Sequence, residues 1–312
     1  MTIAEHRFLV LALAWVLASI PMALLAWQVW WRPGPVHPVI PHEDALPAGS
    51  FLDVALPPPL PDIGERGIVQ RHWRARDGWV ALILVGVGVL TLLMGPLTIG
   101  PEQGSAPKLT PEGVGLMLAF QWGMGGLLLF YLKIGRGLSL TKVFGLNRQP
   151  ALWVPVWAMA WLVPGLITVG ILNWLYLPVF LKWLGQESAS LQPMVSALLE
   201  NPDPKIKWMV AVSAVLGAPF MEELVFRGFL YSVARRFTHW SYAALATSLL
   251  FGIVHGNAQS ILPLTVLGLF FTAAYEHSKS ILVPMVMHGS YNLLMVSLMF
   301  YFPELVKQLE KV

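Results

Sequence analysis

Long apolar blocks, separated by short polar stretches, run through almost the whole chain. Several of them reach or approach the roughly 20 residues that an α-helix needs to cross a bilayer. We therefore predict an all-α, polytopic membrane protein with about eight transmembrane helices, of which the sixth and seventh are the shortest. The predicted spans are Phe8–Trp31, Trp79–Ile99, Gly113–Leu132, Leu152–Leu175, Trp208–Ala234, Trp240–Val254, Ser260–Tyr275 and Ile281–Phe302.

The first block has a second interpretation, a signal peptide that is removed from the mature protein. However, the block is about 24 residues long, is preceded by Arg7 as its single basic residue, and lacks a small-x-small exit. These features favour a retained first transmembrane helix.

Two longer stretches connect the blocks. Residues 32–78 are polar and rich in proline, which favours an extended backbone. We predict a strap outside the membrane, with a linker or a docking segment for a partner as alternatives. Residues 176–207 form a second connector, in which LQPMVSALLE has apolar residues at helical spacing. This segment either lies on the membrane surface or packs as an ordinary loop helix.

Composition supports the membrane assignment and excludes several classes of function. The chain is 56% hydrophobic and 12% charged, whereas soluble domains are roughly 25% charged. The absence of cysteine excludes disulfides and thiolate metal sites. The formal net charge is +3 and the basic residues are scattered between apolar blocks, so we expect no nucleic-acid partner.

Lys and Arg are distributed unequally among the loops between the predicted spans. The odd-numbered loops carry 12 of these residues, whereas the termini and the even-numbered loops carry seven. Because cytoplasmic loops are enriched in Lys and Arg, the odd loops are predicted to lie in the cytoplasm and both termini outside. The predicted location is a prokaryotic cell (inner) membrane, with the lipid bilayer as a partner.

The fifth span contains three charged residues in an otherwise apolar run, APFMEELVFRG. Glu223 and Arg227 are four residues apart and therefore share a helix face, which predicts an ion pair. Glu222 lies about 100° further round the helix, so the same Arg cannot serve both carboxylates equally well. A carboxylate without a partner at this depth marks a candidate functional site.

Partners for Glu222 are available on two later spans. His255 follows the sixth span, and His288 and Asn292 lie at i and i+4 of the eighth span, hence on one face. A carboxylate with an imidazole can hold and deprotonate a water molecule. A second imidazole and an amide can donate hydrogen bonds to an oxyanion. Glu222, His255 and His288 could alternatively bind a metal ion such as Zn²⁺, and the residues themselves leave this choice open.

The segments EELVFRG, FGIVH and HGSYN resemble, in this order, the E-E-x-x-x-R, F-x-x-x-H and H-x-x-x-N/D motifs of the CPBP family. This family comprises type II CAAX prenyl endopeptidases and bacteriocin-processing (Abi) membrane proteins. The resemblance covers the chain from about residue 150 to about residue 300. It implies an eight-helix intramembrane endopeptidase. It also implies that Glu222 is the general base and that His255 binds the water. His288 and Asn292 would then form the oxyanion site, with Glu223 and Arg227 in support.

This resemblance suggests a division of the chain and a set of competing functions. The division is a first helix at 1–31, a proline-rich segment at 32–78, accessory helices at 79–150, a catalytic core at 151–302 and a tail at 303–312. The leading hypothesis is an endopeptidase that cuts a peptide or a membrane-anchored protein. The alternatives are a non-catalytic scaffold with an immunity or assembly role, and a transporter or proton relay, although the paired broken helices typical of many transporters are not evident.

Overall fold

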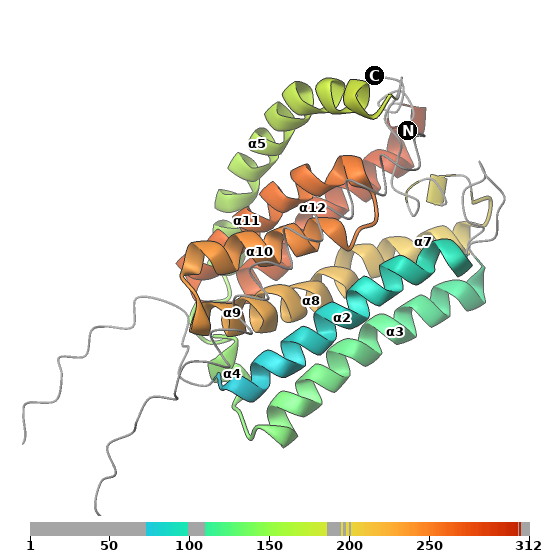
Figure 1. The fold of residues 1–312 in the computed structure, drawn as a ribbon. Coiled ribbons are helices and arrows are strands. Elements are labelled where there is room, and N and C mark those ends of the chain that lie inside the picture. The colour runs from blue at the N-terminus through green and yellow to red at the C-terminus, as the bar shows by residue number, and fades with distance from the viewer. Residues whose placement is uncertain are drawn as a thin grey trace, which may run out of the picture.

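The structure of the protein is a computed structural model that describes residues 73–98, 110–185, 195, 198–199, 201–304 and 306. These residues form helices joined by turns, without strands, so the predicted all-α class is confirmed (Figure 1). The predicted first span at 8–31 lies outside the described residues, as do most of the proline-rich segment 32–78 and most of the tail 303–312.

The described helices follow the predicted spans closely. Five helical stretches are long and apolar enough to cross a membrane: Pro111–Gly135, Trp153–Leu184, Pro204–Phe237, Ala258–Ser278 and Leu282–Tyr301. Two further predicted spans are helices, α2 (Ala75–Thr98) and the shorter α10 (Trp240–Ile253). Seven of the eight predicted spans are therefore helical in the described residues, and the count of eight stays a prediction because the first span is not described.

Helix α5 (Trp153–Leu184) corrects the predicted fourth span, which ended at Leu175. The helix continues for nine more residues into the predicted connector 176–207. Its final turns are aromatic, with ring centroids 4.8 Å apart for Tyr176 and Phe180 and 5.8 Å apart for Phe180 and Trp183. Pro164 and Pro178 lie inside the helix, which curves over the bundle in Figure 1. The helix ends at Gly185, whose φ of 67° is the left-handed conformation typical of a C-terminal glycine.

The rest of this connector is described at 195, 198–199 and from 201 onward. There, Leu198 is buried against Val114, Ile206 and Val210. Of the two interpretations of LQPMVSALLE, this contact agrees with a packed loop helix.

The predicted fifth span is one continuous helical rod that contains two π-helical segments. It consists of α7 (Pro204–Val212), η3 (Ser213–Gly217), α8 (Ala218–Glu223), η4 (Leu224–Tyr231) and α9 (Ser232–Phe237). Asp203 caps its start by accepting a hydrogen bond of 2.8 Å from Lys205 N. The hydroxyl of Ser232, the first residue of α9, donates to Arg227 O in η4 at 2.9 Å and so satisfies a carbonyl. π-Helical turns within α-helices frequently accompany functional sites.

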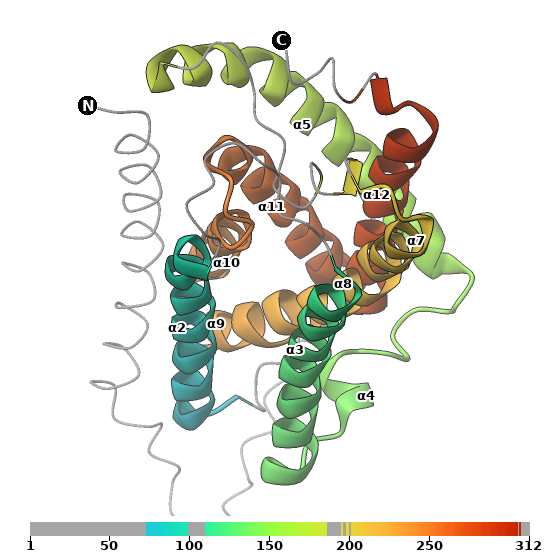
Figure 2. The same cartoon turned by 90° about the vertical axis from the view of Figure 1, so that its right-hand side faces the viewer.

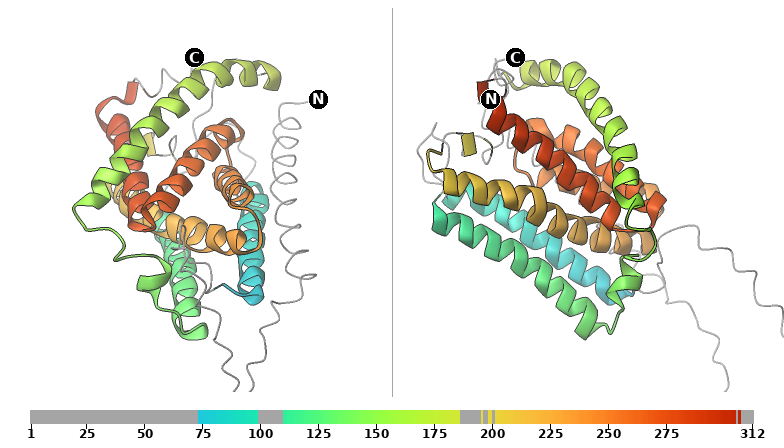
Figure 3. Two further views of the ribbon diagram at one scale, coloured as in Figure 1. Left: turned by 90° about the vertical axis from the view of Figure 1, so that its left-hand side faces the viewer. Right: turned by 180° about the vertical axis from the view of Figure 1, so that it is seen from behind.

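This rod lies between two groups of helices. On one side are α2 and α3 (Pro111–Phe130), the latter extended by η2 (Tyr131–Gly135). On the other are α10, α11 (Ile261–Ser278) and α12 (Leu282–Tyr301), with α5 outermost (Figures 1 and 3). The short helices α4 (Leu140–Val143) and η5 (Ala258–Ser260) lie in loops. Figure 2 shows α10 and α11 side by side above the rod. They approach closely at Gly252, where an added Cβ would lie 2.5 Å from Ile261 O.

Candidate active site

The structure brings the four predicted catalytic residues to one cavity. Glu222, His255, His288 and Asn292 all line a cavity of about 490 Å³ between the rod, α10, α11 and α12. Glu222 comes from the last turn of α8, His255 from the turn after α10, and the other two from successive turns of α12. Residues up to 70 positions apart in sequence thus meet at one place, as the motif spacing predicts, whereas their catalytic roles stay a prediction.

The predicted ion pair between Glu223 and Arg227 is confirmed. Arg227 Nη1 lies 2.9 Å from Glu223 Oε1, and the two side chains are 1% and 0% exposed. Arg227 Nη2 also donates to Gly268 O of α11 at 3.0 Å. The guanidinium lies 4.6 Å from the ring centroid of Phe251 and 5.1 Å from that of Phe271, at cation–π distance. The cation is therefore neutralised and enclosed within the helix bundle.

Glu223 makes a second contact that the sequence analysis missed. Its Oε1 also lies 2.9 Å from Nδ1 of His288, so this carboxylate joins Arg227 on the rod to the imidazole on α12. The sequence contained no signal for this contact, because the pairing with Arg227 already accounted for Glu223. Glu223 therefore positions a predicted catalytic histidine in addition to pairing with the Arg.

The contacts of the His288 ring define its orientation. Phe271 stacks on it with centroids 4.8 Å apart and an interplanar angle of 23°, and Phe251 approaches edge-on at 5.7 Å. With Nδ1–H donated to Glu223, the other nitrogen, Nε2, is directed to Glu222 Oε2 at 4.0 Å. This distance is too long for a direct hydrogen bond.

Glu222 differs from its neighbour in both exposure and partners. Its side chain is 26% exposed, against 0% for Glu223. Its buried Oε2 has no hydrogen-bond partner among the described residues. In the sequence, Glu222 is the carboxylate left over by the ion pair, and the structure places its partly exposed side chain in the wall of the cavity.

His255 and Asn292 are each held by a hydrogen bond between the side chain and a backbone carbonyl. His255 Nδ1 lies 2.7 Å from Phe251 O, the carbonyl one turn earlier in α10, which leaves Nε2 for the cavity. Asn292 Nδ2 donates to Ala214 O in η3 at 2.7 Å. Helix α12 can approach η3 closely because residue 289 is glycine, since an added Cβ would lie 2.9 Å from Val215 O. These hydrogen bonds therefore fix the orientation of both side chains.

The arrangement gives no support to the alternative of a three-ligand metal site. In the described part of the chain, no group of three His, Asp or Glu side chains is placed to hold a metal ion. Two ligands of a tetrahedral Zn²⁺ with bonds of about 2.0 Å would lie about 3.3 Å apart, whereas Glu222 Oε2 and His288 Nε2 are 4.0 Å apart. We therefore derive no reaction step through a metal ion.

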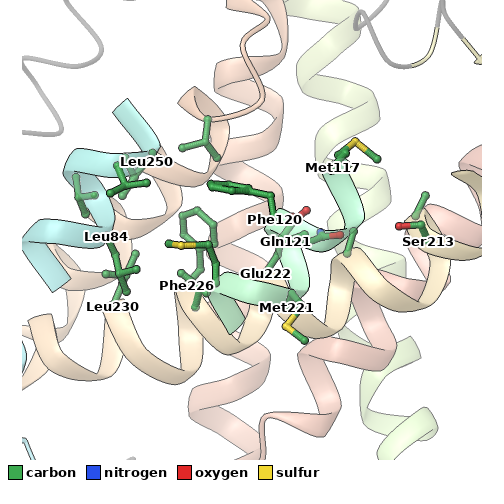
Figure 4. A pocket seen from close by; sticks show the side chains of 18 of the residues that line it. Leu84, Met117, Phe120, Gln121, Ser213, Met221, Glu222, Phe226, Leu230 and Leu250 are labelled. Carbon is green, nitrogen blue, oxygen red and sulfur yellow. The ribbon is translucent and has the colours of Figure 1, made fainter. Parts of the chain in front are cut away.

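A second cavity, of about 420 Å³ and predominantly apolar, lies on the opposite side of Glu222 (Figure 4). It is bounded by α2, α3, the rod and α10, and its polar lining side chains are Gln121, Ser213 and Glu222. Val210, Ala214, Ala218 and Glu222 line both cavities. The carboxylate therefore stands between an apolar compartment and a compartment that contains imidazole and amide groups.

The fold and this site together define a polytopic membrane protein with a carboxylate, two imidazoles and an amide at a cavity among its helices. Residues 204–294 match the model of the family described as type II CAAX prenyl endopeptidase, Rce1-like. This segment contains all six predicted site residues, and its match to that family model agrees with the predicted resemblance.

Curated relatives agree with this assignment. The chain is 30% identical over 141 residues to the "Putative membrane peptidase YdiL" of Bacillus subtilis (strain 168), a match that covers 45% of this chain and 54% of the relative. It is 28% identical over 147 residues to the "UPF0177 protein YbdI" of Lactococcus lactis subsp. lactis (strain IL1403), covering 45% and 74%. The chain thus spans about half the length of YdiL. No solved structure matches it significantly.

These matches and the five long apolar helices make the chain an integral membrane protein with relatives in bacteria. The predicted location in a prokaryotic cell membrane is therefore confirmed. Helices α2, α3 and α5 lie outside the family segment 204–294.

Proposed function

We propose that the protein is an intramembrane endopeptidase that hydrolyses a peptide bond of a peptide or membrane-anchored substrate. The observation that carries the proposal is the Glu222 carboxylate, which has an oxygen without a hydrogen-bond partner, 4.0 Å from His288 Nε2. One water molecule can contact two polar atoms that are this far apart, and the proposal places the attacking water beside Glu222. His255 and Asn292 line the same cavity and supply the further groups that hydrolysis needs.

In the proposed reaction, Glu222 accepts a proton from the water while the water oxygen attacks the carbonyl carbon of the substrate. His255 Nε2 accepts the second hydrogen of this water and so orients it, because Nδ1–H donates to Phe251 O. The tetrahedral intermediate then collapses, the C–N bond breaks, and Glu222 returns its proton to the departing amine. Water is consumed and both protons are accounted for, so the cycle ends with Glu222 ionised again.

The oxyanion of the intermediate would be stabilised from α12. His288 acts with both ring nitrogens protonated, so that Nε2–H donates to the oxyanion while Nδ1–H donates to Glu223. The second Nδ2 hydrogen of Asn292 donates to the same oxygen, because the first is used by Ala214 O. The buried Glu223 carboxylate stabilises the imidazolium charge in addition to holding the ring.

The direct test is a search for peptide hydrolysis by the purified protein in proteoliposomes. A library of fluorogenic peptides and a set of lipid-anchored peptides would be incubated with the parent protein and with Glu222→Gln. Cleavage positions would be read by mass spectrometry. New peptide termini that depend on Glu222 support the proposal, whereas equal cleavage by both proteins assigns the activity to another source.

Replacing Asn292 by Ala should lower kcat on the order of 100-fold, because one oxyanion donor is lost. The KM should change little, since the donor acts mainly in the transition state. The variant also loses the hydrogen bond to Ala214 O, so its melting temperature must be measured alongside the kinetics. A variant that melts like the parent and keeps its kcat would remove Asn292 from the proposed oxyanion site.

The apolar cavity offers a place for an apolar part of the substrate next to the scissile bond. Gly88 on α2 lines this cavity, and a Cβ there would meet Val254 at 3.9 Å, an ordinary contact distance. The change Gly88→Leu should therefore fill part of the cavity without a clash and lower kcat/KM by roughly tenfold or more. Gly86→Leu, two residues away with no atom near its Cβ, is the matched control. If both variants keep the parent's kcat/KM, the substrate does not use this cavity.

A further inference from the structure

We infer that the substrate segment reaches this site from the extracytoplasmic side of the membrane, as an exposed stretch of a peptide or of a membrane-anchored protein. The inference rests on the proposed function for the nature of the substrate. It adds the side of access, which follows from two independent features of the structure. These are the direction in which the site cavity extends and the distribution of charge between the two ends of the bundle.

The residues that line the cavity show in which direction it extends from the site, because on each helix they lie to one side of the site. On α12 the lining runs from His288 to Met299, toward the C-terminus, and on the rod it runs from Glu222 back to Val210. On α11 it runs from Leu267 back to Ser260. These helix ends meet where α7 begins, α10 ends, α11 begins and α12 ends, on the right-hand side of Figure 1. We call this end of the bundle the cavity end.

Side chains fill the bundle on the other side of the site. Arg227, Phe229 and Tyr231 follow Glu223 along the rod, and Phe271 and Tyr275 follow Leu267 along α11. All five are at most 1% exposed. A peptide could not pass through this region without unfolding it, because it contains the Arg227 ion pair and its aromatic neighbours. The site is therefore approached from the cavity end.

The end of the bundle opposite the cavity end is strongly basic, and we call it the basic end. In the described residues it carries nine Lys and Arg against two acidic residues, Asp77 and Glu276. Both acids are paired, Asp77 with Arg136 at 2.7 Å and Glu276 with Arg235 and Lys279. The nine basic residues are Arg74, Arg76, Lys133, Arg136, Lys142, Arg148, Arg235, Arg236 and Lys279.

Two hydrogen bonds and one ion pair show that these segments lie at the same end of the bundle. Ile281 N at the start of α12 donates to Phe144 O after α4 at 3.0 Å. The side chain of Gln149 donates to Ser278 O at the end of α11 at 2.8 Å. The Arg136–Asp77 pair joins the end of η2 to the start of α2.

The cavity end has no such excess of positive charge. Its described charged residues are three basic and three acidic: Lys182, Lys205, Lys207, Glu112, Asp203 and Glu304. The positive-inside rule places the basic end in the cytoplasm. The cavity end, and with it the entrance to Glu222 and the histidines, then faces the outside of the cell. An extracytoplasmic segment of a secreted or membrane-anchored polypeptide is the substrate that this geometry admits.

Labelling of single cysteines in intact cells tests the inference, since the chain has no cysteine of its own. Glu112→Cys and Lys133→Cys place thiols at exposed positions on the two ends of one span, Pro111–Gly135. Met295→Cys places a thiol in the wall of the site cavity. The probe is a membrane-impermeant maleimide. Lys205→Cys and Arg236→Cys repeat the comparison on the span Pro204–Phe237.

We expect the cysteines at 112, 205 and 295 to react in intact cells, and those at 133 and 236 to react only after permeabilisation. The reverse pattern would overturn the orientation and make the substrate cytoplasmic. Labelling of 112 and 205 without 295 in intact cells would overturn the direction of access. Labelling of both ends in intact cells would show mixed orientation and also contradict the inference.

These readouts do not depend on catalysis. The same cysteines can be placed in the Glu222→Gln background, where labelling should be unchanged. A reversed pattern together with Glu222-dependent hydrolysis would refute the side of access while the proposed function stands. The expected pattern together with absent hydrolysis would refute the function while the entrance remains assigned.

Discussion

Glu222→Gln is expected to lower peptide hydrolysis by roughly 10³-fold, because the amide cannot accept the proton that the attacking water must lose. The substitution keeps the size of the side chain. It removes a carboxylate whose Oε2 has no hydrogen-bond partner among the described residues, so little stabilising contact is lost. The melting temperature in detergent should therefore stay close to that of the parent. The measurements are the turnover rate in proteoliposomes and a thermal unfolding curve on the same preparation.

Glu112→Gln is a suitable control, since Glu112 is an exposed residue at the start of α3 and distant from the site along the chain. It should leave hydrolysis unchanged. A Glu222→Gln protein that is folded and fully active would refute the general-base role. If Glu222→Gln instead retains a cellular phenotype or partner binding without hydrolysis, a scaffold function becomes the better account of the chain.

Glu223→Gln is expected to destabilise the protein by about 3 kcal/mol, in contrast to the same substitution at the neighbouring Glu222. The loss of the carboxylate leaves Arg227 as an uncompensated charge that is 1% exposed, and removal of one partner of a buried pair costs about 3–5 kcal/mol. The change also weakens the hydrogen bond to His288 Nδ1, so activity should fall as well. Thermal or denaturant unfolding in detergent measures the loss.

The double variant Glu223→Gln with Arg227→Met separates the buried charge from other effects. Because the unpaired cation is then absent, part of the stability should return, as for buried ion pairs that are replaced by apolar residues. Activity should not return, since the contact to His288 is still changed. A Glu223→Gln protein that unfolds at the parent's temperature would contradict the role assigned to the pair.

The sequence determined the helical class, the bounds of most spans and the membership of the site. These features are encoded locally, because a helix that crosses a bilayer needs a long apolar run and because residues four apart share a face. The ion pair of Glu223 with Arg227 followed from this spacing. The convergence of Glu222, His255, His288 and Asn292 was predicted by their chemistry and by the motif resemblance, since these polar groups lie in or beside apolar spans.

The tertiary structure alone decided how these groups are connected. The contact between Glu223 and His288 joins residues 65 positions apart, and its existence depends on how α12 packs against the rod. The position of Glu222 between two cavities depends on α2 and α3, which lie outside the family segment. Packing between distant helices sets these features, and a pattern along one chain does not record it.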